Sequence, residues 1–551
     1  MYPKKELAQI VISACHQYHI DTVVISPGSR NAPLTVGFSN HTSFNTMSVV
    51  DERCAAFFAL GIAQQTKKPV AILCSSGSAL LNYYPAIAEA FYSNIPLVVI
   101  SADRPKHLID IGDGQTIRQE NVFENHILFS ANLLEGDVHN ETNINLMSES
   151  LQIVTSQKGP VHINVPFDEP LYETVDEMKD FLFLTIASNA VEKLPLDFQY
   201  FSEIWSASAK KMILVGANYP DKELQAVLNE FEKDTSVIIL TESTSNIAAE
   251  DTINSIDKLI FPFTETEFNA FKPEVLITFG GMVVSKKIKQ FLRKKQPKHH
   301  WHVDTLKAMN TYHCLTEYIQ ESPVKFLPKL LDAQSVDSDY QQKWLSEKVK
   351  RSQKHSAYLN RIEFSDLKAF ECILETIPEN SQLQLSNSSI VRYAQLFDVN
   401  NTLSVFCNRG TSGIDGSTST AIGAAFAVSN QTVFVTGDLS FFYDSNGLWN
   451  NHIPNNFRII VVNNAGGGIF RFIPGPKTTN ALDYFETPHQ LTAEHLCKMH
   501  QLEYSFARGL TELKIELNGF YAESDQPKIL EVFTDKEVNE KVLKEYFNFL
   551  K

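Results

Sequence analysis

Cysteine is scarce in this sequence, and its few residues are scattered. The chain has seven cysteines in 551 residues, and no two of them form a CxxC pair. This pattern argues against a disulfide framework and against a zinc knot built on closely spaced thiols. The composition fits a protein of the reducing cytoplasm.

Long apolar segments are also missing. The longest apolar runs, such as Ile95 to Ile100, have the length of a strand, whereas a membrane-spanning helix needs about 20 residues. The first residues, MYPKKELAQIVISACHQY, have the pattern of an amphipathic helix and not of a signal peptide. We therefore expect a cytoplasmic protein with no stable membrane insertion.

Positive charge is the third deficit. The 48 Lys and Arg residues are outnumbered by 64 Asp and Glu residues, which gives a formal net charge of −16. This acidic balance argues against nucleic acid or an anionic membrane as the main partner. It also means that an anionic substrate would need a local cluster of basic side chains.

The sequence does contain a regular alternation of strand and helix patterns. Apolar runs without a period of two, such as DTVVIS, VAILCSS, TVFVTG and RIIVVNN, alternate with helical segments. Such runs are typical of parallel strands that are covered on both faces. A length of 551 residues favours three domains over a single core. We expect an α/β protein made of three doubly wound, mainly parallel-sheet domains.

Polar stretches near residues 187–197 and 334–360 mark the expected domain boundaries. The predicted units are a first domain at 1–186, a central Rossmann-like domain at 190–335, a linker at 336–360 and a last domain at 361–551.

Two segments of the chain repeat one plan. Residues 51–105 and 415–467 both run from a polar turn through a small-residue helix, a strand and an aromatic helix to a second strand. The first and last domains are therefore expected to be copies of one fold. Because ligands bind at the strand ends of such sheets, a ligand is expected to lie between a first and a last domain.

Polar residues follow two apolar runs of the last domain at matched positions. Asp438 comes directly after TVFVTG, and Asn464 follows RIIVV and precedes a glycine-rich turn. In a right-handed βαβ unit both strands end on the same edge, so the two side chains are expected to lie side by side. A carboxylate, an amide oxygen and the backbone carbonyl of Gly466 form a site that suits Mg²⁺. Either residue alone could simply cap a loop, but the pair at this spacing favours a metal site.

These residues resemble the metal and diphosphate motif of the thiamine diphosphate enzymes, in which GD is followed after about 25 residues by NN. The resemblance implies thiamine diphosphate as the cofactor, with Mg²⁺ or Mn²⁺ held by Asp438, Asn464 and Gly466. Leu439 replaces the usual glycine after the aspartate, but none of the implied ligands depends on it. The implied cofactor-binding set is Glu52, Ile414, Gly437, Asp438, Leu439, Ser440, Asn464, Gly466 and Gly467.

Glu52 is the expected catalytic residue. It follows MSVV and begins the helical pattern CAAFFALGIAQQ, so a simple role in the first helical turn is the alternative. The thiamine family places a glutamate of the partner subunit at this point, against N1′ of the cofactor's aminopyrimidine. Such a carboxyl must be buried and able to share a proton. The resemblance thus implies a homodimer or homotetramer with active sites between subunits.

A closer resemblance is to the branch of thiamine enzymes that serves menaquinone (vitamin K2) biosynthesis. It is carried by SPGSRNAPL at 26–34, VDER at 50–53, SADRP at 101–105, NSSIVR at 387–392 and NRGTSGIDG at 408–416. This branch implies decarboxylation of 2-oxoglutarate and 1,4-addition of the succinyl carbanion to isochorismate. Both substrates are dianions, and guanidinium groups bind carboxylates in a bidentate manner. The arginines of these motifs would supply the basic cluster that an acidic protein needs.

The resemblance also implies which residues contact each of the two substrates. Ser388, Arg392 and Arg409 are expected to hold the part derived from 2-oxoglutarate. Isochorismate is expected to face Ser29, Arg30, Arg104, Gln115 and Lys286, while Ile414 bends the cofactor and Ile469 and Phe470 wall the pocket. A single arginine could instead form a surface salt bridge. Lys286 lies in the basic stretch SKKIKQFLRKKQPK, where a solvated helix face is equally favoured.

The central domain carries two patterns to which we assign no ligand. FGGMVVSKK lacks the G-x-G-x-x-G of nucleotide-binding turns. KHHWHVD contains His299, His300 and His302. We interpret it as a solvated strand end rather than a metal site, because neighbouring strand residues point to opposite faces.

Two other functions remain open at this stage. One is another thiamine carboligase or decarboxylase, such as an acetolactate synthase-like enzyme that uses pyruvate. The other is a non-catalytic diphosphate-binding protein, which would be expected to have lost the glutamate that is present at Glu52. A thiamine diphosphate-dependent transferase is the favoured prediction.

Overall fold

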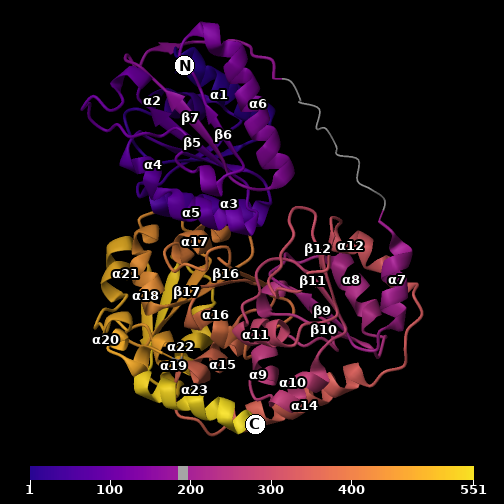
Figure 1. The fold of residues 1–551 in the computed structure, drawn as a ribbon. Helices are drawn as coiled ribbons and strands as arrows, with labels where there is room; N and C mark the ends of the chain where they lie inside the picture. Colours follow the sequence, from indigo (N-terminus) through magenta and orange to yellow (C-terminus); the bar gives the residue numbers. More distant parts are fainter. Residues whose placement is uncertain (184–195, 474) are drawn as a thin grey trace.

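The computed structural model describes residues 1–183, 196–473 and 475–551. It contains three parallel sheets flanked by helices, arranged as three lobes (Figure 1). The boundary expected near 187–197 lies mostly outside the described residues.

The first sheet has six parallel strands in the order β3-β2-β4-β5-β7-β6. These strands are β2 (Thr22–Ile25), β3 (Asn45–Ser48), β4 (Val70–Cys74), β5 (Leu97–Asp103), β6 (Phe129–Asn132) and β7 (Val161–Pro166). The helices are α1 (Glu6–Gln17), α2 (Ala32–Asn40), α3 (Glu52–Thr66), α4 (Ser78–Asn82), α5 (Tyr84–Ser93) and α6 (Asn140–Gln157). A short β1 (Tyr2–Pro3) pairs antiparallel with β8 (Thr174–Val175). The central strands β4 and β5 are buried along their whole length, as expected for a sheet covered on both faces.

The last sheet repeats this plan, with six parallel strands in the order β15-β14-β16-β17-β19-β18. The strands are β14 (Gln382–Leu385), β15 (Ser404–Cys407), β16 (Thr432–Gly437), β17 (Phe457–Asn463), β18 (Glu503–Ala507) and β19 (Lys528–Phe533). The helices are α15 (Asp366–Thr376), α16 (Ser389–Ala394), α17 (Ser417–Ala427), α18 (Asp438–Tyr443), α19 (Ile469–Phe472), α20 (Ala481–Phe485), α21 (Glu494–His500), α22 (Leu510–Phe520) and α23 (Lys536–Leu550). The first and last sheets have the same strand order, which confirms that these two parts of the chain are alike.

The central sheet has five parallel strands in the order β10-β9-β11-β12-β13. Its strands are β9 (Lys211–Val215), β10 (Val237–Leu240), β11 (Val275–Phe279), β12 (His299–Val303) and β13 (Glu317–Ile319). Its helices are α7 (Phe198–Ala207), α8 (Lys222–Phe231), α9 (Ile256–Ile260), α10 (Glu265–Phe271), α11 (Lys286–Lys294), α12 (Pro323–Phe326) and α13 (Pro328–Leu331). The chain is therefore α/β throughout its three sheets, as predicted.

The histidines of β12 correct one prediction. His300 and His302 are buried, and both rings contact the hydroxyl of Thr278 at 2.9 Å. Burial, together with the neighbouring His302, lowers the pKa of His300 to about 4. The interpretation as a solvated strand end is wrong for these two residues because β12 lies between β11 and β13 inside the sheet. Only His299, at the start of the strand, is partly exposed.

The segment predicted as a linker contains the helix α14 (Tyr340–Leu359). At one end Tyr340 and Trp344 pack into the core of the central sheet. At the other end Tyr358 and Leu359 pack into the core of the last sheet. The helix therefore connects the two lobes through buried side chains, and in Figure 1 it lies at the base of the central lobe.

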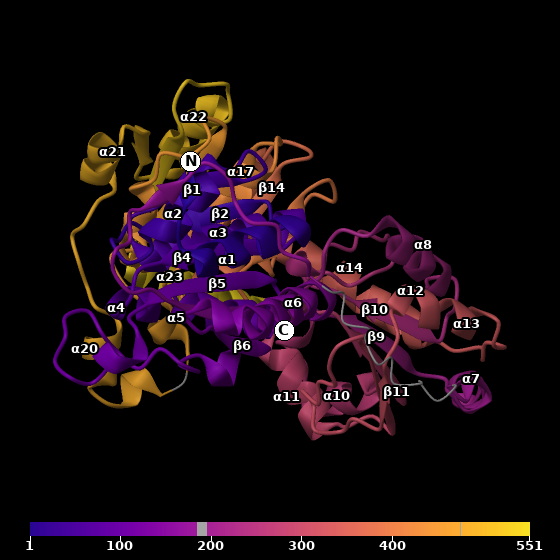
Figure 2. The same ribbon diagram turned by 90° about the horizontal axis from the view of Figure 1, so that it is seen from above.

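The first and last lobes share one hydrophobic core, which is centred on the packing of α3 against α17. Both helices carry a glycine at their crossing. A Cβ at Gly61 would lie 2.1 Å from the carbonyl oxygen of Thr420, and one at Gly423 would lie 1.9 Å from that of Phe58. The missing side chains let the two backbones approach closely. Figure 2 shows the first lobe stacked over the last, with the central lobe to one side.

No helix within residues 1–183, 196–473 and 475–551 is long and apolar enough to cross a membrane.

Candidate active site

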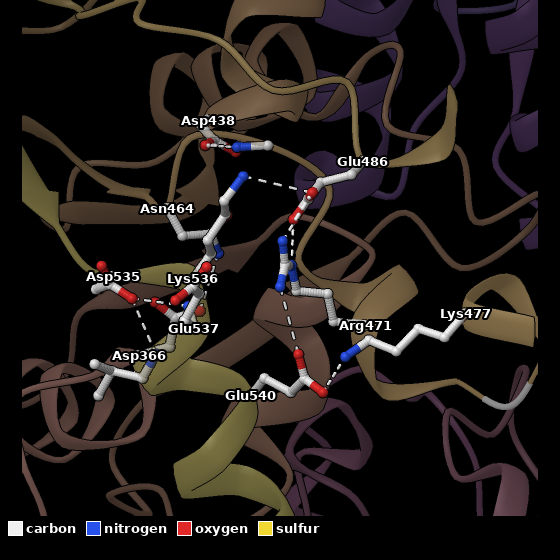
Figure 3. Close-up of polar contacts among 12 residues, drawn as sticks. Asp366, Asp438, Asn464, Arg471, Lys477, Glu486, Asp535, Lys536, Glu537 and Glu540 are labelled. Carbon is white, nitrogen blue, oxygen red and sulfur yellow. Dashed lines mark hydrogen bonds and ion pairs between the residues drawn. The ribbon is translucent and has the colours of Figure 1, made fainter. Parts of the chain in front are cut away.

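Asp438 and Asn464 lie at the carboxyl ends of two neighbouring strands. β16 and β17 pair in parallel up to Gly437 opposite Val462, so Asp438 and Asn464 both emerge at this edge. The backbone N–H of Gly466 donates to Oδ2 of Asp438 at 2.9 Å, and that of Leu439 donates to Oδ1 at 2.7 Å. The structure thus brings together the three residues expected to hold the metal, and Figure 3 shows Asp438 beside Asn464.

The amide of Asn464 is oriented by a carboxylate. Its Nδ2 donates to Oδ2 of Asp366 at 3.0 Å, and its Oδ1 is buried with no hydrogen-bond partner in the described part of the chain. Burial raises the pKa of Asp366 to about 6, although hydrogen bonds from Thr534 and Asn464 oppose this shift. A buried oxygen without a donor is the arrangement that a cation would complete.

The turn at 466–468 is pressed against the segment that ends at Glu486. Gly466 has a φ of +148°, and a Cβ there would lie 2.5 Å from the carbonyl oxygen of Glu486. Gly467 donates its N–H to the same carbonyl at 2.7 Å. Only glycine can occupy this position without strain, and its missing side chain lets the turn pack closely against Glu486 beside Asp438.

Ion pairs hold this segment in place (Figure 3). Arg471 donates to both carboxylate oxygens of Glu486, at 3.0 Å for the longer contact, and this pairing lowers the pKa of Glu486. Arg471 and Lys477 also pair with Glu540 of α23, while Lys536 lies 3.5 Å from Glu486. The predicted pocket residues Ile469 and Phe470 immediately precede Arg471 on α19. The network therefore fixes the wall that they would form.

His489 is a site residue that the sequence analysis did not identify. Its Nε2 lies 3.2 Å from Oδ2 of Asp438 but makes no hydrogen bond among the described residues. Its Nδ1 accepts the N–H of Leu491 at 3.1 Å, so in the neutral ring Nε2 carries the proton. The ring packs edge-on against Phe442. No sequence motif predicts that this histidine lies near Asp438, because it belongs to the connection between α20 and α21.

The loop after β15 carries the predicted residues Arg409 and Ile414, and the first lobe holds it. Glu89 of α5 is buried and accepts N–H groups of Gly410 at 2.7 Å and Thr411 at 2.6 Å. The hydroxyl of Ser440 donates to the carbonyl of Ile414 at 3.2 Å. The loop is therefore tied both to the first lobe and to α18.

The three residues expected to hold 2-oxoglutarate are brought together. Arg409 donates to Oδ1 of Asn387 at 2.7 Å, which places it beside Ser388, and its Nε is buried without a partner in the described chain. Burial lowers the pKa of Arg392 on α16, and the nearby Arg409 lowers it further. Two guanidinium groups that influence one another in this way can together bind a carboxylate.

The central lobe faces these arginines with charged groups of its own. Glu242 is buried and accepts the N–H groups of Val284 and Ser285 at 2.6 and 2.7 Å. Burial raises the pKa of Glu242 to about 7, and Arg409 is among the groups that lower it. Lys289 of α11 is near the same groups, and burial lowers its pKa. The predicted Lys286 is instead exposed at the start of that helix.

The residues expected to face isochorismate lie at the edge of the first sheet. Arg30 is buried, donates to the carbonyl of Phe167 at 2.8 Å and lies 3.2 Å from Glu169. Burial lowers the pKa of Arg30, and the neighbouring Arg104 adds to this. Ser29 and Gln115 are exposed. Among the described residues, no hydrogen bond or ion pair joins this set to Arg392 or Arg409.

Glu52 is the first residue of α3 and lies at the junction of the first and last lobes of one chain. Its carboxylate is half-buried and accepts from Nδ2 of Asn82 at 3.2 Å. Its neighbours reach the last lobe, since Asn446 donates to Asp51 at 2.8 Å and Arg53 donates to the carbonyl of Tyr443 at 3.0 Å. Asp438 is the first residue of α18 and Tyr443 is the last, and a helix of six residues is about 9 Å long. The contact between Arg53 and Tyr443 is therefore one short helix away from Asp438.

Two family models match the chain. "Thiamine pyrophosphate enzyme, N-terminal TPP binding domain" matches residues 5–128, and "Middle domain of thiamine pyrophosphate" matches residues 202–385.

Curated relatives match over the full length. The 2-succinyl-5-enolpyruvyl-6-hydroxy-3-cyclohexene-1-carboxylate synthases of Flavobacterium johnsoniae and Flavobacterium psychrophilum are 53% and 54% identical, with 100% of each chain covered. The synthase of the same name from Christiangramia forsetii is 49% identical at the same coverage. On this evidence the chain is a thiamine pyrophosphate-dependent enzyme and belongs to the family of the 2-succinyl-5-enolpyruvyl-6-hydroxy-3-cyclohexene-1-carboxylate synthases.

Proposed function

We propose that this enzyme decarboxylates 2-oxoglutarate and adds the resulting succinyl group to isochorismate in menaquinone biosynthesis, in the cytoplasm. The observation that carries the proposal is the full-length identity to synthases of that name, at 49–54%. The chemistry of the site supports it, because two dianionic substrates require the paired guanidinium groups at Arg392 and Arg409 and at Arg30 and Arg104.

The residues around Asp438 fit a divalent cation and a diphosphate. Asp438, Oδ1 of Asn464 and the carbonyl of Gly466 would hold Mg²⁺ or Mn²⁺, and the buried Oδ1 without a partner supports this assignment. Gly437, Leu439, Ser440 and Gly467 would border the diphosphate. When bound, thiamine diphosphate supplies a nucleophilic carbon and an electron sink for the decarboxylation.

The protein's part in the reaction is to move one proton, to bind carboxylates and to exclude water. Glu52 would share a proton with N1′ of the aminopyrimidine, which requires a shielded carboxyl. Arg392, Arg409 and Ser388 would hold the donor, and Ser29, Arg30, Arg104, Gln115 and Lys286 would hold the acceptor. Ile414 would bend the cofactor, while Ile469 and Phe470 would wall the pocket and keep water from the reacting carbon.

The direct test is an assay with thiamine diphosphate, Mg²⁺, 2-oxoglutarate and isochorismate. We expect loss of isochorismate absorbance and a product mass equal to isochorismate plus a succinyl semialdehyde unit. Release of carbon dioxide without consumption of isochorismate would contradict the proposed acceptor. No reaction in the presence of bound cofactor would contradict the proposed activity.

A pyruvate-using carboligase is the nearest alternative. Arg409 distinguishes the two functions, because pyruvate lacks the second carboxylate that a guanidinium group would bind. We expect Arg409→Ala to lower kcat/KM for 2-oxoglutarate by about 10–100-fold, the equivalent of one charged hydrogen bond. Any residual turnover of pyruvate should change little. An equal loss for both substrates would favour the alternative.

We also propose a homodimer or homotetramer in which a first lobe and a last lobe of different subunits form each active site. The resemblance in the motif around Glu52 supports this arrangement. The packing of α3 on α17 within one chain supports the alternative, in which both halves of a site come from the same subunit.

A further inference from the structure

Asn464 is held by a group that lies outside the predicted metal ligands. A carboxylate can only accept hydrogen bonds, so Oδ2 of Asp366, at 3.0 Å, selects the Nδ2 side of the amide. The other side, Oδ1, is then turned away from Asp366, and it is buried without a partner in the described chain. The orientation of this amide therefore depends on Asp366.

Asp366 is itself fixed by residues from a different part of the chain. Its Oδ1 accepts the hydroxyl of Thr534 at 2.5 Å, and its backbone N–H donates to Asn539 at 2.7 Å. Asn539 in turn donates to the hydroxyl of Thr534 at 3.1 Å. Asp366 and Asn539 are only 2% and 3% exposed, so this arrangement is sheltered from water. Figure 3 shows Asp366 on the far side of Asn464 from Asp438.

A simpler role for Asp366 would be to stabilise the start of α15, where it is the first residue. Acidic side chains in a first helical turn are favoured by the helix dipole. In this structure, however, both carboxylate oxygens are used elsewhere, by Asn464 and Thr534, and no N–H of α15 is bonded to them. Helix capping therefore does not account for its contacts.

We propose that Asp366 is a positioning residue for the divalent cation. By accepting the N–H of Asn464, it turns Oδ1 of that residue toward the cation, without binding the cation itself. Without Asp366 the amide can rotate and present its NH₂ group, which cannot bind a metal. This inference rests on the proposed metal site, and it adds a residue outside the motifs that predict that site.

The first test is Mg²⁺ binding by calorimetry in the presence of saturating thiamine diphosphate. We expect Asp366→Ala to weaken Mg²⁺ affinity by about 10–100-fold, the usual effect of removing a residue that orients a ligand. Asp535→Ala is the matched control, because Asp535 lies nearby in Figure 3 but, within the described parts of the chain, accepts only the N–H groups of Glu537 and Val538. The control should alter the melting temperature and leave Mg²⁺ affinity unchanged.

An exchange of the two side chains separates positioning from a purely structural role. Asn464→Asp alone would set two carboxylates face to face, and we expect it to weaken Mg²⁺ binding. The double variant Asp366→Asn with Asn464→Asp restores one N–H···O contact with the donor and acceptor reversed. We expect it to bind Mg²⁺ more tightly than Asn464→Asp alone, whereas independent structural roles would make the two losses add.

The outcomes separate this inference from the proposed function. Wild-type Mg²⁺ affinity in Asp366→Ala, together with loss of binding in Asp438→Ala, would overturn the inference and leave the metal site standing. Wild-type affinity in Asp438→Ala would overturn the metal site itself. If Asp366→Ala does not fold, the double variant Asp366→Asn with Asn464→Asp tests the inference instead. A double variant that binds Mg²⁺ no more tightly than Asn464→Asp overturns the inference.

Discussion

Asp438 and Asn464 show how single side chains are prepared for a ligand. Asp438 receives a backbone N–H group on each of its carboxylate oxygens, which fixes the orientation of the carboxylate. Nδ2 of Asn464 is hydrogen-bonded, whereas its Oδ1 is buried and has no hydrogen-bond partner among the residues that the structure describes. Leaving a buried acceptor unpaired costs roughly 1–3 kcal/mol, so a ligand that pairs it gains affinity.

At the residue scale, Glu52 yields a direct prediction. Glu52→Gln keeps the size of the side chain but removes the exchangeable carboxyl proton. We expect carbon–carbon bond formation to fall by about 10²–10⁴-fold, as for the loss of a general acid–base group. Cofactor binding, measured by calorimetry, should stay within a few-fold of wild type. Normal turnover in this variant would refute the role assigned to Glu52.

At the element scale, the crossing of α3 and α17 depends on glycine. Gly423→Ala would place a Cβ 1.9 Å from the carbonyl of Phe58, so backbone must move. We expect a loss of stability of about 1–3 kcal/mol or more, seen as a lower melting temperature. In Gly519→Ala, at the end of α22, the new Cβ meets no described atom within 4 Å, and the substitution should raise stability by up to about 1 kcal/mol. Equal melting temperatures for the two variants would show that the crossing is not tightly packed.

The buried His300 of β12 leads us to expect that the stability of the protein depends on pH. The pKa of His300 is about 4 in the folded protein against 6.5 when exposed, because burial disfavours the charged ring. The unfolded chain therefore binds a proton that the folded chain does not between these values. The stability that this histidine contributes is complete above pH 6.5 and is lost as the pH falls toward 4, which amounts to roughly 2 kcal/mol at pH 5.

Urea unfolding at pH 7 and pH 5 tests this prediction. The difference in unfolding free energy between the two pH values should be smaller for His300→Gln than for wild type. The control His495→Gln changes an exposed histidine and should keep the wild-type difference. If the difference in unfolding free energy between pH 7 and pH 5 is the same in His300→Gln as in wild type, protonation of His300 is not linked to unfolding.

At the scale of the whole molecule, the question is which subunits share an active site. Mixing Glu52→Gln and Asp438→Ala subunits answers it. If each site combines two subunits, a mixed dimer has one site with both residues intact. Statistical exchange in a homodimer should then restore about a quarter of wild-type activity. If each site lies within one chain, the mixture should stay as inactive as either variant, so the product assay decides between the two arrangements.

The fold class and the pairing of Asp438 with Asn464 could both be predicted from the order of residues along the chain. Both follow from local rules, because apolar runs form buried parallel strands and the ends of neighbouring parallel strands meet at one edge. The matching strand order of the first and last sheets was likewise visible as a repeat in the sequence. The motifs had already grouped Arg392 with Arg409 and Arg30 with Arg104, and in the structure the members of each pair influence one another electrostatically.

The distant residues that surround these strand ends could not be predicted and are known from the folded structure. Asp366 stands 98 residues before Asn464, and Glu89 stands more than 300 residues before the loop that it holds. His489 arrives on a loop, and His300 and His302 are buried because β12 is an inner strand. Such contacts depend on how whole elements pack, and neither spacing nor periodicity along the chain encodes that packing.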